Sequence, residues 1–128
     1  MAKRKLLKLS KLKKKAEGVF HKWIVLRDHG ECYTCDSPGN QAGHHFHGKL
    51  DFSPYNLHCQ CARCNLYLSG NQTEYTYRLM NELGQERYDA LKRESNIPRR
   101  YTREELNGYI EYYQNLIDNF KEEECEDF

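Results

Sequence analysis

The sequence predicts a small α+β fold in which a zinc-stabilised, loop-rich centre lies between helices. Two observations predict this fold: the centre contains two C-x-x-C pairs, and apolar residues recur at helical spacing on both sides of it. A third observation is the thin apolar supply, because 38% of the 128 residues are hydrophobic while 30% are charged. A single domain of this size and composition needs a metal or a partner to complete its core.

Helical spacing of apolar residues is found on both sides of the centre. Residues 19–27 predict a first helix, which Asp28-His29-Gly30 ends. The helical period returns at about residue 73 and continues to about 120, with a break in the Asn96-Ile97-Pro98 segment. The final helix opens at Thr102, which has the spacing of a capping box with Glu105.

The two ends of the chain carry opposite charge, although the formal net charge is +1. Residues 1–16 contain eight Lys or Arg and no acid, whereas residues 118–128 contain six acids and one Lys. We divide the chain into a basic arm (1–16), a main domain (17–120) and an acidic tail (121–128). The arm is expected to bind nucleic-acid phosphates, and the alternative is a solubilising tail. The lysines expected to bind are Lys11, Lys13, Lys14 and Lys15.

The cysteine pairs in the centre have the spacing of a structural zinc site. Each pair places two thiolates on one tight turn, and two pairs complete the tetrahedral shell that zinc favours. The four predicted ligands are Cys32, Cys35, Cys61 and Cys64. A redox C-x-x-C would need a βαβ context, and a disulfide network would need export. Cys59 is a possible substitute ligand, and Cys125 is expected to be a free thiol.

Two absences in the sequence point to a reducing compartment. No run of ten apolar residues could begin a membrane span, and the basic start has no apolar segment of a secretory signal behind it. We therefore expect a cytoplasmic protein that does not bind membranes.

The segment between the cysteine pairs carries more polar residues than a zinc ribbon needs. Three histidines fall in Gln41-Ala-Gly-His44-His45-Phe-His47, followed by Asn56-Leu-His58 and by Asn65 directly after Cys64. Neutral imidazole suits a general base at physiological pH, because its ordinary pKa is about 6.5. The alternatives are a second zinc site or a histidine-decorated loop. The roles of His47, His58 and Asn71 stay open.

These phrases resemble the HNH (His-Me finger, ββα-metal) endonucleases, and more closely the phage NinG (Rap) recombination proteins. The matching phrases extend over about residues 19–120 and are specific in their order and spacing. They are Ala42-Gly43-His44, Asn56-Leu57-His58, Gln60-Cys61-x-x-Cys64-Asn65, Ser69-Gly70-Asn71, Tyr77-Arg78-Leu79, Gly84-Gln85-Glu86 and Tyr101-Thr102-x-Glu104-Glu105. The resemblance implies a zinc-stabilised ββα-metal finger over about residues 31–72, with one helix before it and helices after it.

The resemblance also implies a role for each polar residue. His44 would be the general base, Asn56 would brace the loop facing it, and Asn65 would bind a catalytic Mg²⁺ or Mn²⁺. The chain departs from the common HNH pattern at Gly43, where an acid or a second His usually binds the metal. Two assignments follow: either His44 is the base, or His44 is a metal ligand and His45 is the base.

The function implied is a metal-dependent DNA endonuclease of a phage or prophage that acts on branched or four-way recombination intermediates. A symmetric dimer, formed through the apolar face of the last helix, would suit a four-way junction. The alternative is a noncatalytic zinc module that binds nucleic acid or a recombination partner. The tyrosines after the centre either pack in a helical core or contact bases.

Overall fold

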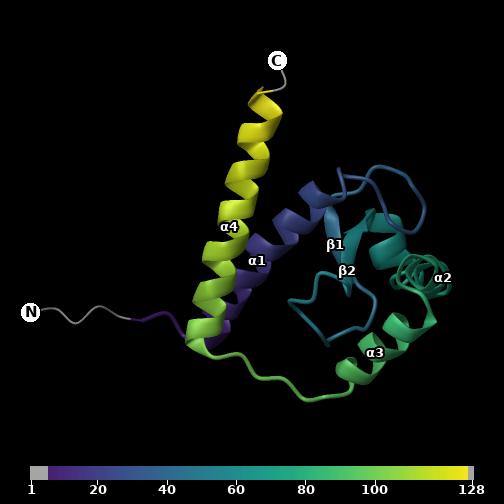
Figure 1. Ribbon diagram of the computed structural model, residues 1–128, viewed down its shortest axis with the longest axis horizontal. Helices are drawn as coiled ribbons and strands as arrows, with labels where there is room; N and C mark the ends of the chain where they lie inside the picture. Colours follow the sequence, from purple (N-terminus) through teal and green to yellow (C-terminus); the bar gives the residue numbers. More distant parts are fainter. Residues whose placement is uncertain (1–5, 127–128) are drawn as a thin grey trace, which may run out of the picture.

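The computed structural model describes the backbone of residues 6–126 and the side chains of residues 6–122. Its elements are α1 (Leu9–Arg27), β1 (Gln41–His44), β2 (Leu57–Gln60), the short π-helix η1 (Arg63–Tyr67), α2 (Gln72–Leu83), α3 (Gln85–Ser95) and α4 (Arg103–Glu126). In Figure 1 α4 runs beside α1, the two strands lie next to α1, and α2 and α3 lie beyond the strands. The prediction of a small α+β fold is confirmed.

Helix α1 begins well before the helix expected from residue 19. Its buried residues repeat every four positions, and this stripe includes Leu12 and Ala16 as well as Phe20 and Ile24. Residues 9–16 of the expected arm are therefore part of the folded domain, because Leu12 and Ala16 extend the apolar face. Residues 1–5 of the arm lie outside the described residues.

Strands β1 and β2 form a two-stranded antiparallel sheet, with Gln41 opposite Gln60 and His44 opposite Leu57. Successive side chains of a strand point to opposite faces. Ala42 and Leu57 belong to a core formed with α1 and α4, so His44 also points to this face. The opposite face carries Gln41, Gly43, His58 and Gln60 and lies toward η1 and α2.

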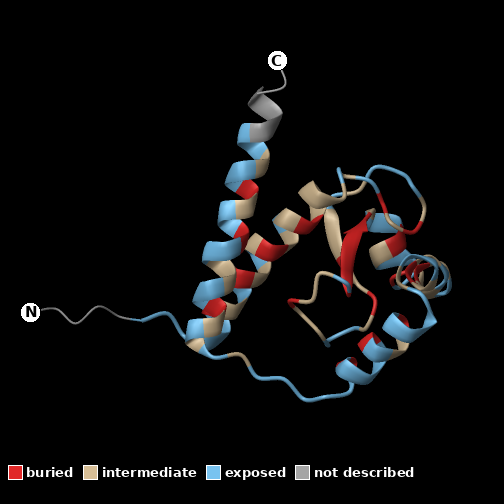
Figure 2. Cartoon of the chain, in the orientation of Figure 1, coloured by how far each residue is buried: buried red, intermediate tan, exposed pale blue. Residues whose placement is uncertain are grey.

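Each face of the sheet is covered by its own core. The first core joins α1 to α4, where Phe20 packs 4.6 Å from the ring of Tyr113. The second contains Tyr75, Leu79, Tyr88 and Leu91 of α2 and α3. Figure 2 shows β2 buried along its length between these cores and the outer side of α4 exposed. Tyr75, Tyr88 and Tyr113 are thus core residues, which agrees with the expectation that tyrosines pack in a helical core.

Helix α4 opens with the capping box expected from the sequence. The backbone N–H of Glu105 donates to Thr102 Oγ1, and the N–H of Thr102 donates to Glu105 Oε1, each at 3.1 Å. The apolar face of α4, including Leu106 and Ile117, packs on α1. The face expected to form a dimer is therefore used within the chain. The helix runs into the expected acidic tail, where residues 127–128 and the Cys125 side chain lie outside the described part.

The segment after β2 differs from the helix expected in a ββα finger. The position of the finger helix, directly after β2, holds only the five-residue η1. The π-type hydrogen bond from Leu68 N to Arg63 O measures 2.9 Å. Ser69, Gly70 and Asn71 then have φ values of 50°, 93° and 49°. These left-handed conformations end η1 before α2 begins. None of the helices in the described part of the chain is long and apolar enough to cross a membrane.

Candidate functional site

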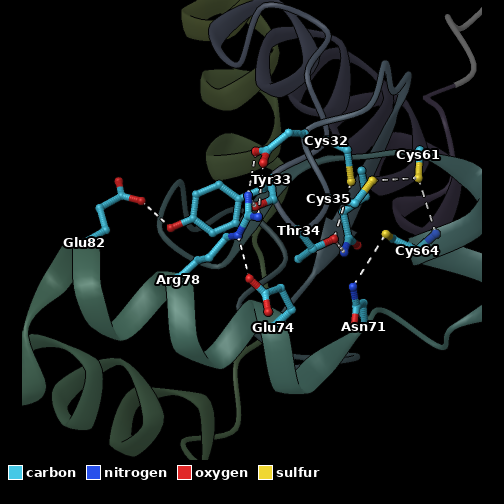
Figure 3. Close-up of polar contacts among 12 residues, drawn as sticks. Cys32, Tyr33, Thr34, Cys35, Cys61, Cys64, Asn71, Glu74, Arg78 and Glu82 are labelled. Atoms are coloured by element: carbon cyan, nitrogen blue, oxygen red, sulfur yellow. Dashed lines mark hydrogen bonds and ion pairs between the residues drawn. The ribbon is translucent and has the colours of Figure 1, made fainter.

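The four predicted zinc ligands come together in one cluster. The Sγ atoms of Cys32, Cys35, Cys61 and Cys64 all lie within 4.8 Å of one another. The Cys35 and Cys61 sulfurs are 3.6 Å apart, close to the roughly 3.8 Å expected for tetrahedral Zn–S bonds of about 2.3 Å. Figure 3 shows the sulfurs facing one another between two loops. Four thiols so arranged fit a metal such as zinc.

Cys59 does not take part in this cluster. It pairs with Ala42, and both residues point to the sheet face that packs on α1. Cys59 is buried in that face and is absent from the group of four close sulfurs. The expectation that Cys59 could replace a ligand is therefore wrong. The five cysteines in the described part of the chain are all free of disulfides.

Polar contacts hold the two cysteine loops against the rest of the fold. Asn71 Nδ2 lies 3.7 Å from Cys64 Sγ, and Thr34 Oγ1 lies 3.4 Å from Cys32 Sγ. Asn71 thus supports the cluster, whereas the sequence left its role open. Arg78 of α2 donates to the Tyr33 carbonyl at 2.9 Å and to Asp36 at 2.6 Å (Figure 3). These contacts of Arg78 fix the first cysteine loop on α2.

His44 lies at the end of β1, next to an acid that the sequence analysis missed. Its Nε2 is 3.3 Å from Asp51 Oδ1, and Lys13 donates to the other Asp51 oxygen at 2.8 Å. Contact with His44, followed by the Lys13 hydrogen bond, holds the pKa of Asp51 well below its usual range. Asp51 is therefore an ionised carboxylate that joins α1 to the candidate base. It is the one acid between the two strands, which could have singled it out.

His21 of α1 completes the surroundings of His44. The two imidazole rings meet edge to face, with centroids 6.0 Å apart. Burial, and then the neighbouring His44, lowers the pKa of His21. The side chain of His44 keeps 20% of its surface exposed, so solvent reaches the candidate base.

His45 lies in the second core, on the side opposite His44. It is 6% exposed, and its Nε2 is 2.7 Å from the Tyr88 hydroxyl. Its ring centroid lies 5.0 Å from that of Tyr75, and burial lowers its pKa. A neutral histidine packed among tyrosines is poorly placed to meet a substrate. Of the two histidines, His44 is therefore the one that solvent reaches.

Asn56 closes the loop that follows His44. Its side chain is fully buried, and Oδ1 accepts a 2.8 Å hydrogen bond from the N–H of Phe46. Its Nδ2 donates to the Lys49 carbonyl at 2.9 Å. These bonds fix both ends of residues 46–49, which is the bracing role that the resemblance implies for Asn56.

Asn65 lies on the other face of β1 from His44. Its Nδ2 donates to Gln41 Oε1 at 2.8 Å, and its Oδ1 stands 3.0 Å from the point where a Cβ on Gly43 would lie. The structure therefore does not place the expected base and metal ligand on one face. Both flank β1, whose outer edge is unpaired within residues 6–126. A phosphate that touches both must lie across this edge.

The remaining histidines of the motif have different environments. His58 is buried, stacks on Tyr33 at 3.9 Å and places Nδ1 3.0 Å from the Tyr75 hydroxyl. Since that hydroxyl donates to the Gly43 carbonyl at 2.9 Å, His58 must donate through Nδ1. His47 is exposed, with Nε2 3.1 Å from Gln72 Nε2. His58 thus supports the sheet, whereas His47 lies on the surface of the molecule in the loop after β1.

Three of the four lysines expected to bind nucleic acid are free to do so. Lys11, Lys14 and Lys15 are exposed on the first turns of α1. Lys13 is half-buried and points the other way, to Asp51. Because α1 also carries His21, whose ring packs against that of His44, the lysines lie on the helix that contacts the candidate base.

Replacing a cluster thiol should release the metal, whereas replacing Cys59 should not. We expect Cys64→Ser to lower bound zinc below one equivalent and to lose helical circular dichroism, because the binding energy of such sites is folding energy. Cys59→Ala is the matched control and should keep one zinc per chain. Equal zinc content in the two purified variants would contradict the four-thiol site.

Acid should destabilise the fold through His58. Burial lowers the pKa of His58 to about 3, from 6.5 in an unfolded chain. Below pH 6.5 the unfolded chain therefore takes up a proton that the folded chain refuses, and stability falls toward pH 3. Urea unfolding at pH 7.5 and 5.0 should show that His58→Gln loses about 2 kcal/mol less than wild type over this interval. The cysteine thiolates titrate in both proteins. Equal losses of stability in wild type and in His58→Gln would therefore disprove that His58 causes the pH dependence.

Comparisons with known proteins agree with the sequence motifs. The family model described as bacteriophage lambda NinG protein matches residues 1–124. Protein ninG of Escherichia phage 933W is 33% identical over 122 residues, which cover 88% of this chain and 60% of that protein. Protein ninG of Escherichia phage lambda is 36% identical over 115 residues, which cover 82% of this chain and 55% of that protein.

The chain thus spans somewhat more than half the length of these relatives. No solved structure matches it significantly. Because the family model covers nearly all of the sequence, the chain belongs to the NinG family.

Proposed function

We propose that this chain is a metal-dependent DNA endonuclease in which His44 activates the attacking water. One observation carries the proposal: His44, whose side chain is 20% exposed, lies against an ionised Asp51 directly before the loop that Asn56 braces. A carboxylate that orients a histidine is a recurring arrangement in hydrolytic sites. The expected family role of His44 supports the same conclusion.

Asp51 is a positioning residue for His44 in this proposal. Nε2 of His44 lies 3.3 Å from an Asp51 oxygen without forming a hydrogen bond, so in this proposal Asp51 acts on the imidazole through its charge, and Nδ1 would accept a proton from water. Lys13 neutralises the outer oxygen of Asp51 and fixes its position. The proton taken from water then forms an imidazolium that Asp51 stabilises.

The scissile phosphate would lie across the outer edge of β1. A groove of about 290 Å³ lies between α1 and the start of β1, lined by Val25, Leu26 and Ala42 and by the polar residues His21, Lys22 and Asn40. Lys22 is exposed there and can neutralise a phosphate oxygen. From the other face, Asn65 would hold a divalent ion, which when bound would stabilise the charge on the leaving oxygen.

An exposed apolar run next to Asn65 favours branched DNA as the substrate. Leu66, Tyr67 and Leu68 are 62%, 82% and 43% exposed. Apolar side chains that bind DNA insert between base steps that are already weakly stacked. Bases at a branch point are unstacked on one side, so a phosphate bound near Asn65 would bring them to this run.

The noncatalytic alternative is a zinc module that only binds nucleic acid. Both proposals expect zinc and salt-sensitive binding to DNA, since the cysteine cluster and the lysines of α1 serve either one. They differ in what His44 and Asp51 do, because a binding module has no need of an oriented base.

Removal of the base should abolish cutting and spare binding. We expect His44→Ala to lower the rate of Mg²⁺- or Mn²⁺-dependent cleavage by about 10²–10⁴-fold, because a general base contributes that much. Zinc content, circular dichroism and DNA affinity should stay near wild type. Linear, nicked and four-way DNA substrates, each with and without the ion, give the measurement.

His47→Ala is the matched control, because His47 is an exposed histidine of the same motif and should cut at nearly the wild-type rate. Binding without metal-dependent cutting of any of the three DNAs by wild type would favour the noncatalytic module. Full activity of His44→Ala would remove His44 from the mechanism.

The lysines of α1 should supply affinity that does not depend on sequence. We expect the triple change Lys11→Ala, Lys14→Ala and Lys15→Ala to weaken binding to all DNA sequences alike. The slope of log K against log salt should fall by about 3, since each lost phosphate contact contributes about 0.9. The exposed Lys92 of α3, changed to Ala, is the control. A loss confined to particular sequences would contradict a backbone-only role.

A further inference from the structure

The face of β1 that carries Asn65 has an unusual feature at Gly43. A Cβ built on Gly43 would stand 1.8 Å from Gln60 Oε1 and 2.7 Å from Gln60 Cδ. The side chain of Gln60, on β2, therefore fills the space that any side chain at position 43 would need. Any side chain at position 43 would therefore clash with Gln60 as it is placed here.

The orientation of the Gln60 amide is fixed by its neighbours. Its Nε2 donates to the Gly70 carbonyl at 2.9 Å and to Thr34 Oγ1 at 3.1 Å. Since a carbonyl oxygen only accepts, the amide nitrogen must face Gly70, and Oε1 must face Gly43. Gln60 is fully buried, yet Oε1 has no hydrogen-bond partner among the described residues. Buried acceptors without a partner are rare and costly, which points to a missing ligand.

A second amide oxygen faces the same place. Asn65 Oδ1 is 3.0 Å and Gln60 Oε1 is 1.8 Å from the position of that absent Cβ, so the two oxygens lie within 4.8 Å of each other beside β1. Asn65 is held there by the hydrogen bond from its Nδ2 to Gln41. Asn65 is half-exposed, so the site opens to solvent on one side while Gln60 forms its buried wall.

We propose that Gln60 Oε1 and Asn65 Oδ1 bind a divalent cation, with Gln60 replacing an acid at position 43. The proposal rests on the proposed function, because the ion is the one that the nuclease would use. Neither ligand is charged, and among the described residues the cysteine cluster is the single group of three or more His, Cys, Asp or Glu suited to a metal. Amide oxygens alone leave the charge of Mg²⁺ or Mn²⁺ uncompensated.

It follows that the DNA supplies the anionic ligand. Mg²⁺ and Mn²⁺ sites in enzymes of this kind retain water and take substrate phosphate oxygens. A neutral protein site should therefore bind the ion weakly in free protein and much more tightly when a phosphate lies on the β1 edge. By linkage, the ion must tighten DNA binding by the same factor.

The test measures Mn²⁺ binding by electron paramagnetic resonance on the zinc-loaded full chain, in a His44→Ala background that leaves DNA uncut. Four-way DNA alone is the blank. We expect DNA to tighten Mn²⁺ binding to the protein at least tenfold, and Gln60→Ala to lose most of this gain. Gln72→Ala, a nearby amide outside the site, should keep it. Zinc content and circular dichroism report the fold of each variant.

Two further variants add an acid to the site, and the first of them keeps the proposal testable if Gln60→Ala does not fold. Asn65→Asp adds a carboxylate at the solvent side, and the pair Gly43→Asp with Gln60→Ala restores an acid where its Cβ now has room. Each should bind Mn²⁺ at least tenfold more tightly than wild type without DNA.

Unchanged Mn²⁺ binding in Gln60→Ala, or in both of the variants with an added acid, would overturn the cation site. Metal-dependent cleavage by wild type would still support the nuclease in that case. Conversely, Mn²⁺ binding that follows these variants, in a protein that cuts no DNA, would uphold the cation site and reject the proposed function.

Discussion

The four-thiol cluster is the constraint on which the rest of the structure depends. Residues 28–40 contain no helix and no strand, and β1 and β2 have four residues each, so hydrogen bonding alone offers little to order this region. The cluster ties the loop before β1 to the turn after β2, which fixes the open end of the strand pair, where Gln41 lies opposite Gln60. Arg78, Thr34 and Asn71 then connect the cluster to α2 and to Gln60. A metal such as zinc, bound there, would add to the stability that the two small cores supply.

The two-stranded sheet acts as a thin partition between two cores, and strand alternation decides what each histidine can do. His44 points to α1, where Asp51 and His21 meet it, while His45 points to the tyrosines of α2 and α3. Two adjacent histidines in one motif therefore have unrelated roles. A single residue of register shift would exchange them, so the pairing fixed by the cysteine cluster also selects the histidine that reaches solvent.

Much of this arrangement could be predicted from local sequence. The cysteine spacing, the Thr102 capping box and the apolar period of α2 through α4 each depend on residues close together in the chain. The start of α1 was missed because the lysines around Leu12 and Ala16 hid the apolar stripe. Asp51 and Gln60 were missed for another reason: their roles come from contacts with Lys13, His44 and Gly43, which lie 7 to 38 residues away. Contacts between residues so far apart leave no regular spacing in the sequence.

The separation of base and cation across β1 has a chemical consequence for the proposed nuclease. The base side depends on α1, through Lys13 and Asp51, whereas the cation side depends on the cysteine loops, through Thr34 and Gly70. In the proposed nuclease the two halves would meet at one phosphate on the strand edge, so neither would act on a phosphate that approaches one face alone. The proposed cation site, which has no charged ligand, would add a second condition. The ion would be bound tightly only when a phosphate is present. Both conditions make the chemistry depend on how the DNA backbone is presented, which suits an enzyme that must recognise the shape of its substrate more than its bases.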